Sequence, residues 1–565
     1  MKLILPKALR GFSYDRAMPV EFNSFNDDVW LPSLFFKVVT GGQDRGRNAN
    51  DPTNLERYVE ALAGHPHVDG FEGDVGYRLL NRLTRTSLVQ MGFRGQAHRS
   101  EQIESVSPYS ILAFKPGFPE HASVSRKVDV LVYRMMRDQM RGDALLRTFF
   151  ERVFGHGVHV QGGAQPGGTY DGCTEIGTLT RLSLCLLDGF QSVGARPPKE
   201  RIPGEPMPAF ASAMARDLQR YLQAYHDKMP VEALTHHFRG LVSVELFIYT
   251  LKLFHALPAL VSDASVLPAA MRELLQTSAP EIYLDFTGTA SGLSRSMATF
   301  CVRRDLESIH PFMTAVLTVR HFDRLVRAVR GDKKVVQAVE AGLDGKEGPA
   351  YLQLLLTLRD DLAVALRVDT AAEHEEEEIR SLNSENPGDD MMSASREYID
   401  HVTIDGESGF QRLILLLCDV QRGKIFETAS QWYRNIGGLT RPYGLLTGTS
   451  ANRSTWRYAP GNDLLATLVQ LAAVDIPQWN TDTPAPAPVA LAGFLKWLEK
   501  RFGIIVDRPP DTVHGAEYTA AAQENLQAML RRLRQMGVFR DLSDDVTVQR
   551  LHPPYTNNSI GASAP

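Results

Sequence analysis

Cysteine, net charge and long apolar runs are all scarce in this chain of 565 residues. Its four cysteines form no C-x-x-C pair, which argues against a zinc knuckle or redox motif and favours buried thiols in a reducing cytoplasm. The net charge of −5 gives no overall basic bias toward nucleic acid, so any basic surface must be local. The length is too great for one ordinary core and predicts about two to four domains.

The sequence also lacks an uninterrupted apolar run that would predict a membrane span. The longest run, residues 240–261, contains Glu245 and Lys252, and Pro258 would break its end. This pattern is more typical of a buried core helix than of a membrane helix. The N-terminus has an apolar patch of only three residues before Pro6, too short for a secretory signal. We therefore expect no membrane contact and a cytoplasmic location.

Catalytic signatures are missing as well. The chain contains no H-E-x-x-H zinc motif, no phosphate-binding G-x-x-x-x-G-K-[ST] loop and no G-x-S-x-G nucleophile motif. We therefore assign no catalytic residue, no metal ligand and no cofactor. Residues 284–296 predict a helix start capped by hydroxyl side chains, and a weak anion site at Ser294 and Arg295 is the alternative.

The patterns that are present predict a mainly α protein with small β elements. Helical periodicity dominates a large helical body, whereas the N-terminal part is mixed and the C-terminal part ends in a winged-helix-like module. One stretch combines a run of glutamates with Asn, Pro and Gly, and it predicts an acidic flexible linker. The predicted order is a mixed α/β N-terminal domain, a helical body, the linker and a C-terminal region, over residues 1–124, 125–370, 371–395 and 396–565.

Three segments of the first half have less regular patterns. Residues 29–39 are rich in β-branched and aromatic side chains and predict a strand, and residues 107–117 predict a short strand ended by Pro-Gly. Residues 155–177 hold eight glycines and cannot be helical throughout. A long surface loop is the favoured interpretation of this glycine-rich segment, and a ligand lid is the alternative.

A basic and aromatic stretch precedes the C-terminal module. Between residues 421 and 461 six basic residues face one acid, and tryptophans and tyrosines alternate with them. Guanidinium groups bind phosphates and aromatic rings stack on exposed bases, so this pattern predicts nucleic-acid contact. The alternative is that the rings are core and the arginines face solvent. The candidate contacts in this stretch are Arg434, Arg441, Arg453 and Arg457.

The end of the chain predicts a winged-helix-like module over about residues 456–551. Three amphipathic segments are followed by a predicted hairpin at 538–551, which is the order of a winged helix. The last helix, about 517–536, has an apolar face and an opposite face of arginine and glutamine that could reach phosphates or base edges. The candidate DNA-binding residues of this module are Gln527, Arg531, Arg534, Gln535, Arg540 and Arg550.

Two strings in this region, "GGLTRPYGLLTGTSANRSTWRYAPGNDLL" and "FLKWLEKRFGIIVDRPP", carry a resemblance to a known family. The C-terminal third resembles accessory components of bacterial antiphage defence systems of the methylation-associated type. The resemblance implies a cytoplasmic bacterial protein that works beside an ATPase, a methyltransferase or a nuclease encoded elsewhere. It carries over no catalytic residue.

Two functions from different classes follow. The first is a non-catalytic subunit of a multi-protein defence complex that binds double-stranded DNA or serves as a scaffold. The second is a nuclease or other hydrolase whose site is assembled from residues distant in sequence. Metal-dependent cleavage of DNA, abolished by a single carboxylate substitution, would distinguish the second from the first.

Overall fold

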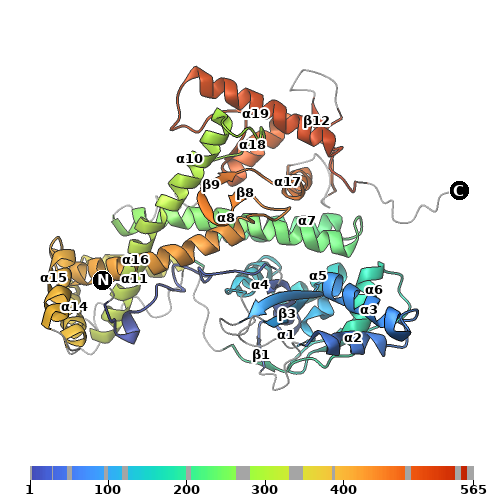
Figure 1. Cartoon of the computed structure of the whole chain (residues 1–565), viewed down its shortest axis with the longest axis horizontal. Coiled ribbons are helices and arrows are strands. Elements are labelled where there is room, and N and C mark those ends of the chain that lie inside the picture. The colour runs from blue at the N-terminus through green and yellow to red at the C-terminus, as the bar shows by residue number, and fades with distance from the viewer. Residues whose placement is uncertain are drawn as a thin grey trace.

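The computed structural model describes residues 3–27, 29–46, 54–94, 100–116, 125–198, 205–262, 280–329, 348–384, 389–476, 485–540 and 549–556. Helix accounts for 61% and strand for 9% of the structure, which confirms the prediction of a mainly α fold with small β elements. In Figure 1 the long helix α8 crosses the middle of the molecule, with the N-terminal part on one side and the C-terminal helices on the other.

The N-terminal part mixes short helices with two-stranded antiparallel sheets. The sheets pair β1 with β6, β2 with β3, and β4 with β5. Its elements are η1 (Lys7–Leu9), α1 (Trp30–Thr40), β1 (Asp44–Arg45), α2 (Leu55–Ala63), α3 (Gly73–Leu83), η2 (Thr84–Leu88), β2 (Val89–Arg94), β3 (Ser100–Val106), η3 (Ile111–Phe114), α4 (Val128–Gln139), α5 (Asp143–Phe154), β4 (Val158–Gln161), β5 (Gly167–Tyr170), α6 (Thr178–Asp188) and β6 (Ala195–Arg196).

Both strands predicted in this part are wrong. Residues 30–40 form helix α1, which is buried along its whole length. A short run that is apolar on every side has no period to separate a buried strand from a buried helix. Pro32 lies in the first turn, where a missing N–H costs nothing, and Gly41 ends the helix with a left-handed φ of +70°. The strand predicted within 107–117 is instead the 3-10 turn η3.

The rest of the chain is a helical body with the C-terminal elements packed onto it. Its elements are α7 (Pro208–Tyr225), α8 (Val231–Ser262), β7 (Ile282–Tyr283), α10 (Leu293–Glu307), α11 (Ile309–Ala328), α13 (Gly348–Arg359), α14 (Leu362–Ser384), α15 (Asp389–Thr403), α16 (Gly409–Ile436), β8 (Leu446–Thr449), β9 (Asn452–Tyr458), α17 (Asn462–Asp475), β10 (Val489–Ala490), α18 (Leu491–Phe502), β11 (Ile504–Ile505), α19 (Ala516–Gln535) and β12 (Arg550–Leu551).

Helix α8 forms the centre of the core and packs against α7, α11, α16 and α17. Among the described helices it is the one long and apolar enough to cross a membrane by length and composition, and 78% of its apolar window is buried inside the protein. Burial of this segment agrees with the prediction of a core helix over 240–261. Glu245 and Lys252, which interrupt the apolar run, are buried with it.

The structure corrects the prediction of a flexible linker over its first part. Residues 371–384 continue helix α14, which packs against α16 and α15. Ala372, Glu376 and Ile379 are buried, and Glu376 accepts hydrogen bonds from Arg380 and Arg412. Glu373, Glu377 and Glu378 therefore form a solvated helix face, whereas Glu376 lies on the buried face with Ala372 and Ile379. Residues 385–388 lie outside the described residues, and α15 begins at Asp389.

The glycine-rich segment is also more ordered than a surface loop. Strands β4 and β5 form an antiparallel hairpin with Val158 opposite Tyr170. Gly168 packs so closely against Leu112 that a Cβ on Gly168 would lie only 2.3 Å from the Leu112 Cδ2 atom. The Lys115 ammonium group donates to the Gly168 carbonyl at 3.3 Å. The hairpin is therefore docked onto η3.

The first described segment, residues 3–27, reaches helix α16 of the helical body. Phe22 stacks on Trp432 of α16, with ring centres 5.4 Å apart and planes 11° from parallel. The Gly11 N–H donates to the Gln421 side chain at 2.7 Å. Segments about 410 residues apart in the chain therefore share one hydrophobic core.

Candidate nucleic-acid interface

Helix α19 is anchored by one buried side chain in its middle. Asn525 donates to the backbone carbonyl oxygens of Leu284 at 2.7 Å and Val506 at 3.1 Å. Its Oδ1 atom accepts the Phe286 N–H at 2.7 Å. Three backbone groups that strand pairing leaves unpaired are satisfied in this way. The bonds fix the rotation of α19, so that Met529 and Leu533 face the core.

The outward face of α19 carries the predicted contact residues. Gln527, Arg531, Arg534 and Gln535 are all exposed. Exposed acids, Glu517 and Glu524, lie in the N-terminal half of the helix, so the exposed charge changes from acidic to basic along its axis. Helix α19 therefore presents its arginines at its C-terminal end.

Arg531 and Arg534, the two exposed arginines on this end of the helix, keep their charged groups available. Arg531 makes no ion pair with any described residue, and the Arg534 guanidinium lies 4.9 Å from the centre of the Phe539 ring. Beyond the helix, Arg540 donates to the Gly537 carbonyl at 3.3 Å and remains exposed. Arg550 is exposed on β12. A guanidinium over a ring or on a carbonyl is still a full positive charge.

The strands around α19 form a small antiparallel arrangement. Strand β12 pairs with β10, with Leu551 opposite Val489, and Leu551 also bridges Phe539. The order along the chain is α17, β10, α18, β11, α19, the Phe539 bridge and β12, and β11 pairs in parallel with β7. Residues 541–548, the centre of the predicted hairpin, lie outside the described residues.

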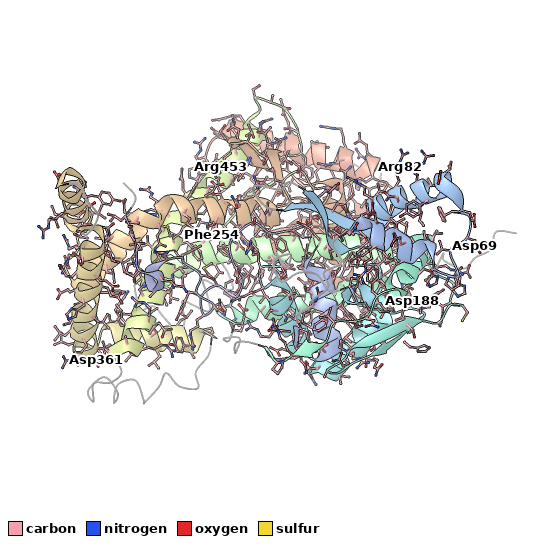
Figure 2. The ribbon with its side chains drawn as sticks, turned by 60° about the horizontal axis from the view of Figure 1, so that its bottom comes forward. Asp69, Arg82, Asp188, Phe254, Asp361 and Arg453 are labelled. Atoms are coloured by element: carbon pink, nitrogen blue, oxygen red, sulfur yellow. The ribbon has the colours of Figure 1, made fainter. Side chains whose placement is uncertain are left out.

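The four arginines predicted in the basic stretch are bound within the chain. Arg457 lies 3.3 Å from the buried carboxylate of Asp285, and Arg441 lies 3.3 Å from that of Asp27. Arg453 pairs with Glu427, and this hydrogen bond holds the pKa of the Glu427 carboxyl below its usual value. Figure 2 shows Arg453 near the edge of the molecule, where this pair is open to solvent. Arg434 donates to the Ser450 hydroxyl at 2.9 Å.

The tryptophans and tyrosines of the same stretch belong to the core, which is the alternative left open by the sequence. All of them are buried, and the Trp432 indole N–H donates to Thr250 at 3.1 Å. The two tyrosine hydroxyls of Tyr433 and Tyr458 lie 2.7 Å apart. None of these rings is placed to stack on a base. The buried rings are Trp432, Tyr433, Tyr443, Trp456 and Tyr458.

The helix start at Ser294 holds an anion that the chain itself provides. The Ser294 hydroxyl is buried and donates to the Asp285 carboxylate at 2.9 Å. The same carboxylate oxygen accepts the Thr287 N–H at 3.0 Å and the Thr287 hydroxyl at 2.7 Å. Arg295, the second residue of this predicted weak anion site, is half-buried in the first turn of α10. Asp285 therefore occupies the position that an external anion would take.

A buried ionic cluster that the sequence analysis missed joins α18 to the helical body. Arg501 donates to both oxygens of Glu245, at 2.9 and 2.8 Å, and to Asp217 at 2.7 Å. Burial raises the pKa of both carboxyls, and the Arg501 charge opposes that rise. The one signal of this cluster in the sequence is Glu245, a glutamate inside an apolar run, because a buried charge needs a partner. The sequence does not show that this partner is Arg501.

Comparison with known proteins identifies the chain at the family level. The family model described as methylation-associated defense system protein MAD7 matches residues 7–555. No curated protein and no solved structure matches the chain. The match extends over the anchored helix α19, the ionic cluster and the N-terminal part together. The chain therefore belongs to the family of the methylation-associated defense system protein MAD7.

Proposed function

We propose that the protein is a non-catalytic subunit of a multi-protein antiphage defence complex, and that it holds double-stranded DNA with the C-terminal half of α19. The observation that carries the proposal is the pair Arg531 and Arg534, exposed on a helix whose opposite face is fixed by Asn525. A rigid helix that presents guanidinium groups can contact phosphates in register or read a guanine edge.

The chain topology supports a winged-helix interpretation of the region around α19. The module's order of a helix, a strand, two further helices and a closing strand that pairs back on the first strand is present here, with the short strand β11 added between the last two helices. In such a module the last helix enters the major groove. Arg540 and Arg550 flank the residues of the predicted wing, where they would meet the backbone beside the groove.

The test is binding of the purified full-length protein to short DNA duplexes at several salt concentrations. We expect the double substitution Arg531→Ala and Arg534→Ala to weaken binding by about 1–3 kcal/mol if one arginine reads a base. If both contact phosphates, the slope of log affinity against log salt becomes shallower by about two. Folding survives, because exposed substitutions cost within about 0.5 kcal/mol each.

A matched control is the double substitution Arg78→Ala and Arg82→Ala, which removes two exposed arginines from α3. It changes the net charge of the protein by the same amount as the α19 double substitution does. Figure 2 shows Arg82 at the outer edge of the N-terminal part. If both double variants weaken DNA binding equally, the effect is one of net charge and α19 is not the contact. Unchanged affinity in a folded α19 variant contradicts the DNA role directly.

A scaffold role is the second candidate, favoured by an apolar ridge at the start of α14. Leu362 is 74% exposed and Leu366 is 58% exposed, one helical turn apart. Contiguous exposed leucines of this kind mark protein contacts. We expect Leu362→Ser with Leu366→Ser to release a co-purifying defence subunit, such as an ATPase, methyltransferase or nuclease, without changing DNA affinity. A nuclease activity of the chain itself, shown by metal-dependent cleavage lost on a carboxylate substitution, would contradict both roles.

A further inference from the structure

Helix α3 presents apolar side chains to solvent. Val75 is 73% exposed and Leu79 is 57% exposed, and the two lie one helical turn apart. Of the 11 residues of α3, only Leu80 is buried. A helix this short is marginal in water unless packing supports it. Figure 1 shows α3 at the outer end of the N-terminal part, where its exposed side is accessible to another molecule.

The exposed charges of α3 change sign along the helix. Glu72 and Asp74 lie at its N-terminal end, Arg78 and Arg82 lie in its C-terminal half, and all four are exposed. The Arg78 Nε atom donates to the backbone carbonyl of Asp74 at 3.2 Å. None of the four side chains forms an ion pair with a residue that the structure describes. The helix therefore offers two negative charges at one end and two positive charges at the other, with the apolar pair between Asp74 and Arg82.

Such a face is complementary to a copy of itself that is turned end to end. A two-fold interface requires that each patch fit its own equivalent, so that residue i meets residue j and j meets i. With the axis midway between Val75 and Leu79, each valine meets Leu79 of the second copy. The acidic end of each helix then lies beside the basic end of the other, and the two helix dipoles are also opposed. A parallel pair would instead bring like charges together.

We propose that the protein forms a two-fold homodimer in which the α3 helices of two copies pack antiparallel. The interface lies apart from the proposed DNA-binding face and from the apolar ridge of α14, because α3 contributes to neither. A helix of this length spans only about 16 Å. The contact is therefore at the small end of specific interfaces, and we expect a Kd on the order of 10 µM.

Sedimentation velocity of the full-length protein over about 1–200 µM tests the proposal. We expect a reversible change from the mass of one chain to that of two. Val75→Ser with Leu79→Ser should raise the Kd at least about tenfold and leave the fold intact, because both side chains are exposed. Leu362→Ser with Leu366→Ser, which removes the exposed apolar pair of α14, is the matched control and should leave the dimer unchanged.

Charge reversal tests the antiparallel arrangement. Arg78→Glu with Arg82→Glu makes both ends of α3 acidic, and Glu72→Lys with Asp74→Lys makes both ends basic. Each variant alone should be monomeric, because like charges then face each other across the axis. An equimolar mixture of the two should form a dimer, since every acidic end again meets a basic end. Recovery on mixing also shows that both variants are folded.

Three results would overturn the proposal. The first is a wild-type protein that remains a monomer at about 200 µM, well above the expected Kd. The second is a dimer that persists unchanged in the Val75→Ser and Leu79→Ser variant or is lost equally in the α14 control. The third is a charge-reversed variant that dimerises alone as well as the wild type does. DNA binding does not enter these measurements, so the proposed DNA role stands or fails separately.

Discussion

At the scale of single residues, the partners of buried charges decide how the C-terminal elements are held. Arg501 of α18 meets Asp217 of α7 and Glu245 of α8, and all three side chains are largely removed from water. A buried ion pair adds little net stability compared with an apolar replacement, but loss of one partner leaves an uncompensated charge. The cluster therefore makes the position of α18 depend on one guanidinium group.

We expect Arg501→Met to lower the free energy of unfolding by about 3–5 kcal/mol, because Glu245 and Asp217 stay buried without their cation. Lys500→Met, the exposed neighbour on the same helix, is the control and should cost within about 0.5 kcal/mol. Chemical denaturation at pH 7 measures both. Equal effects of the two substitutions would show that the cluster does not hold α18.

The same cluster predicts a dependence of stability on pH. The folded protein raises the pKa of Glu245 above its ordinary value of 4.5, so the folded state binds this proton more tightly than the unfolded state does. Protonated Glu245 therefore contributes its full stability below pH 4.5. This contribution is lost as pH rises toward the pKa of Glu245 in the folded protein. We expect Glu245→Gln to remove this loss and to flatten the unfolding free energy as pH rises above 4.5. A wild-type slope that persists unchanged in Glu245→Gln would assign the titration to another group.

At the scale of elements, the sequence predicted the long amphipathic helices and failed where local pattern carries little information. The apolar and polar faces of α19 follow from residue spacing, so Gln527, Arg531 and Arg534 were placed outward correctly from sequence alone. For the arginines of the basic stretch, such as Arg457, residue spacing could not show which are free to bind DNA and which are paired within the protein. Their partners, such as Asp285, lie far away in the chain, and no local pattern indicates an ion pair with a distant residue.

Two other failures have a similar origin. The run of glutamates at 375–378 predicted repulsion and disorder, but buried Ala372 and Ile379 give α14 an apolar face at helical spacing. The glycines at 155–177 predicted a loop, but two of them allow the hairpin to lie directly on η3 and α5. Composition alone cannot tell a glycine used for flexibility from a glycine used for close packing.

Two adjacent glycines in β5 test this distinction. A Cβ on Gly168 would lie 2.3 Å from Leu112 Cδ2, whereas a Cβ on Gly167 would meet nothing closer than 3.7 Å. We expect Gly168→Ala to destabilise the protein by about 1–3 kcal/mol through overpacking. Gly167→Ala should stay within about 0.5 kcal/mol of wild type. Thermal unfolding compares the two, and the reverse order would show that the hairpin is not docked on η3.

At the scale of the whole molecule, the predicted parts share contacts that cross their boundaries. Helix α17 of the predicted C-terminal region packs on α7 and α8, and β11 pairs in parallel with β7. Tyr221 of α7 donates to the buried Gln470 side chain of α17 at 2.7 Å. The C-terminal elements thus complete a core that the helical body begins.

We expect residues 396–565 expressed alone to remain unfolded, because this fragment loses the surfaces of α7, α8 and α10 that bury its apolar side chains. Circular dichroism and a urea titration measure the outcome. A cooperative unfolding transition in the isolated fragment would establish it as an independent domain and contradict this expectation. Co-expression with residues 1–395 should restore a cooperative transition, since the missing surfaces are then supplied in trans.

The contact between Gly11 and Gln421 has a consequence for how the chain is made. These residues are 410 positions apart, and both belong to the final packed structure. A ribosome that adds about 5–20 residues per second needs roughly 20–80 s to make the chain between them. Throughout that interval Phe22 of the first segment has no α16 to cover it. The nascent polypeptide thus exposes an early hydrophobic residue until a much later helix has been made, which is the situation in which molecular chaperones bind.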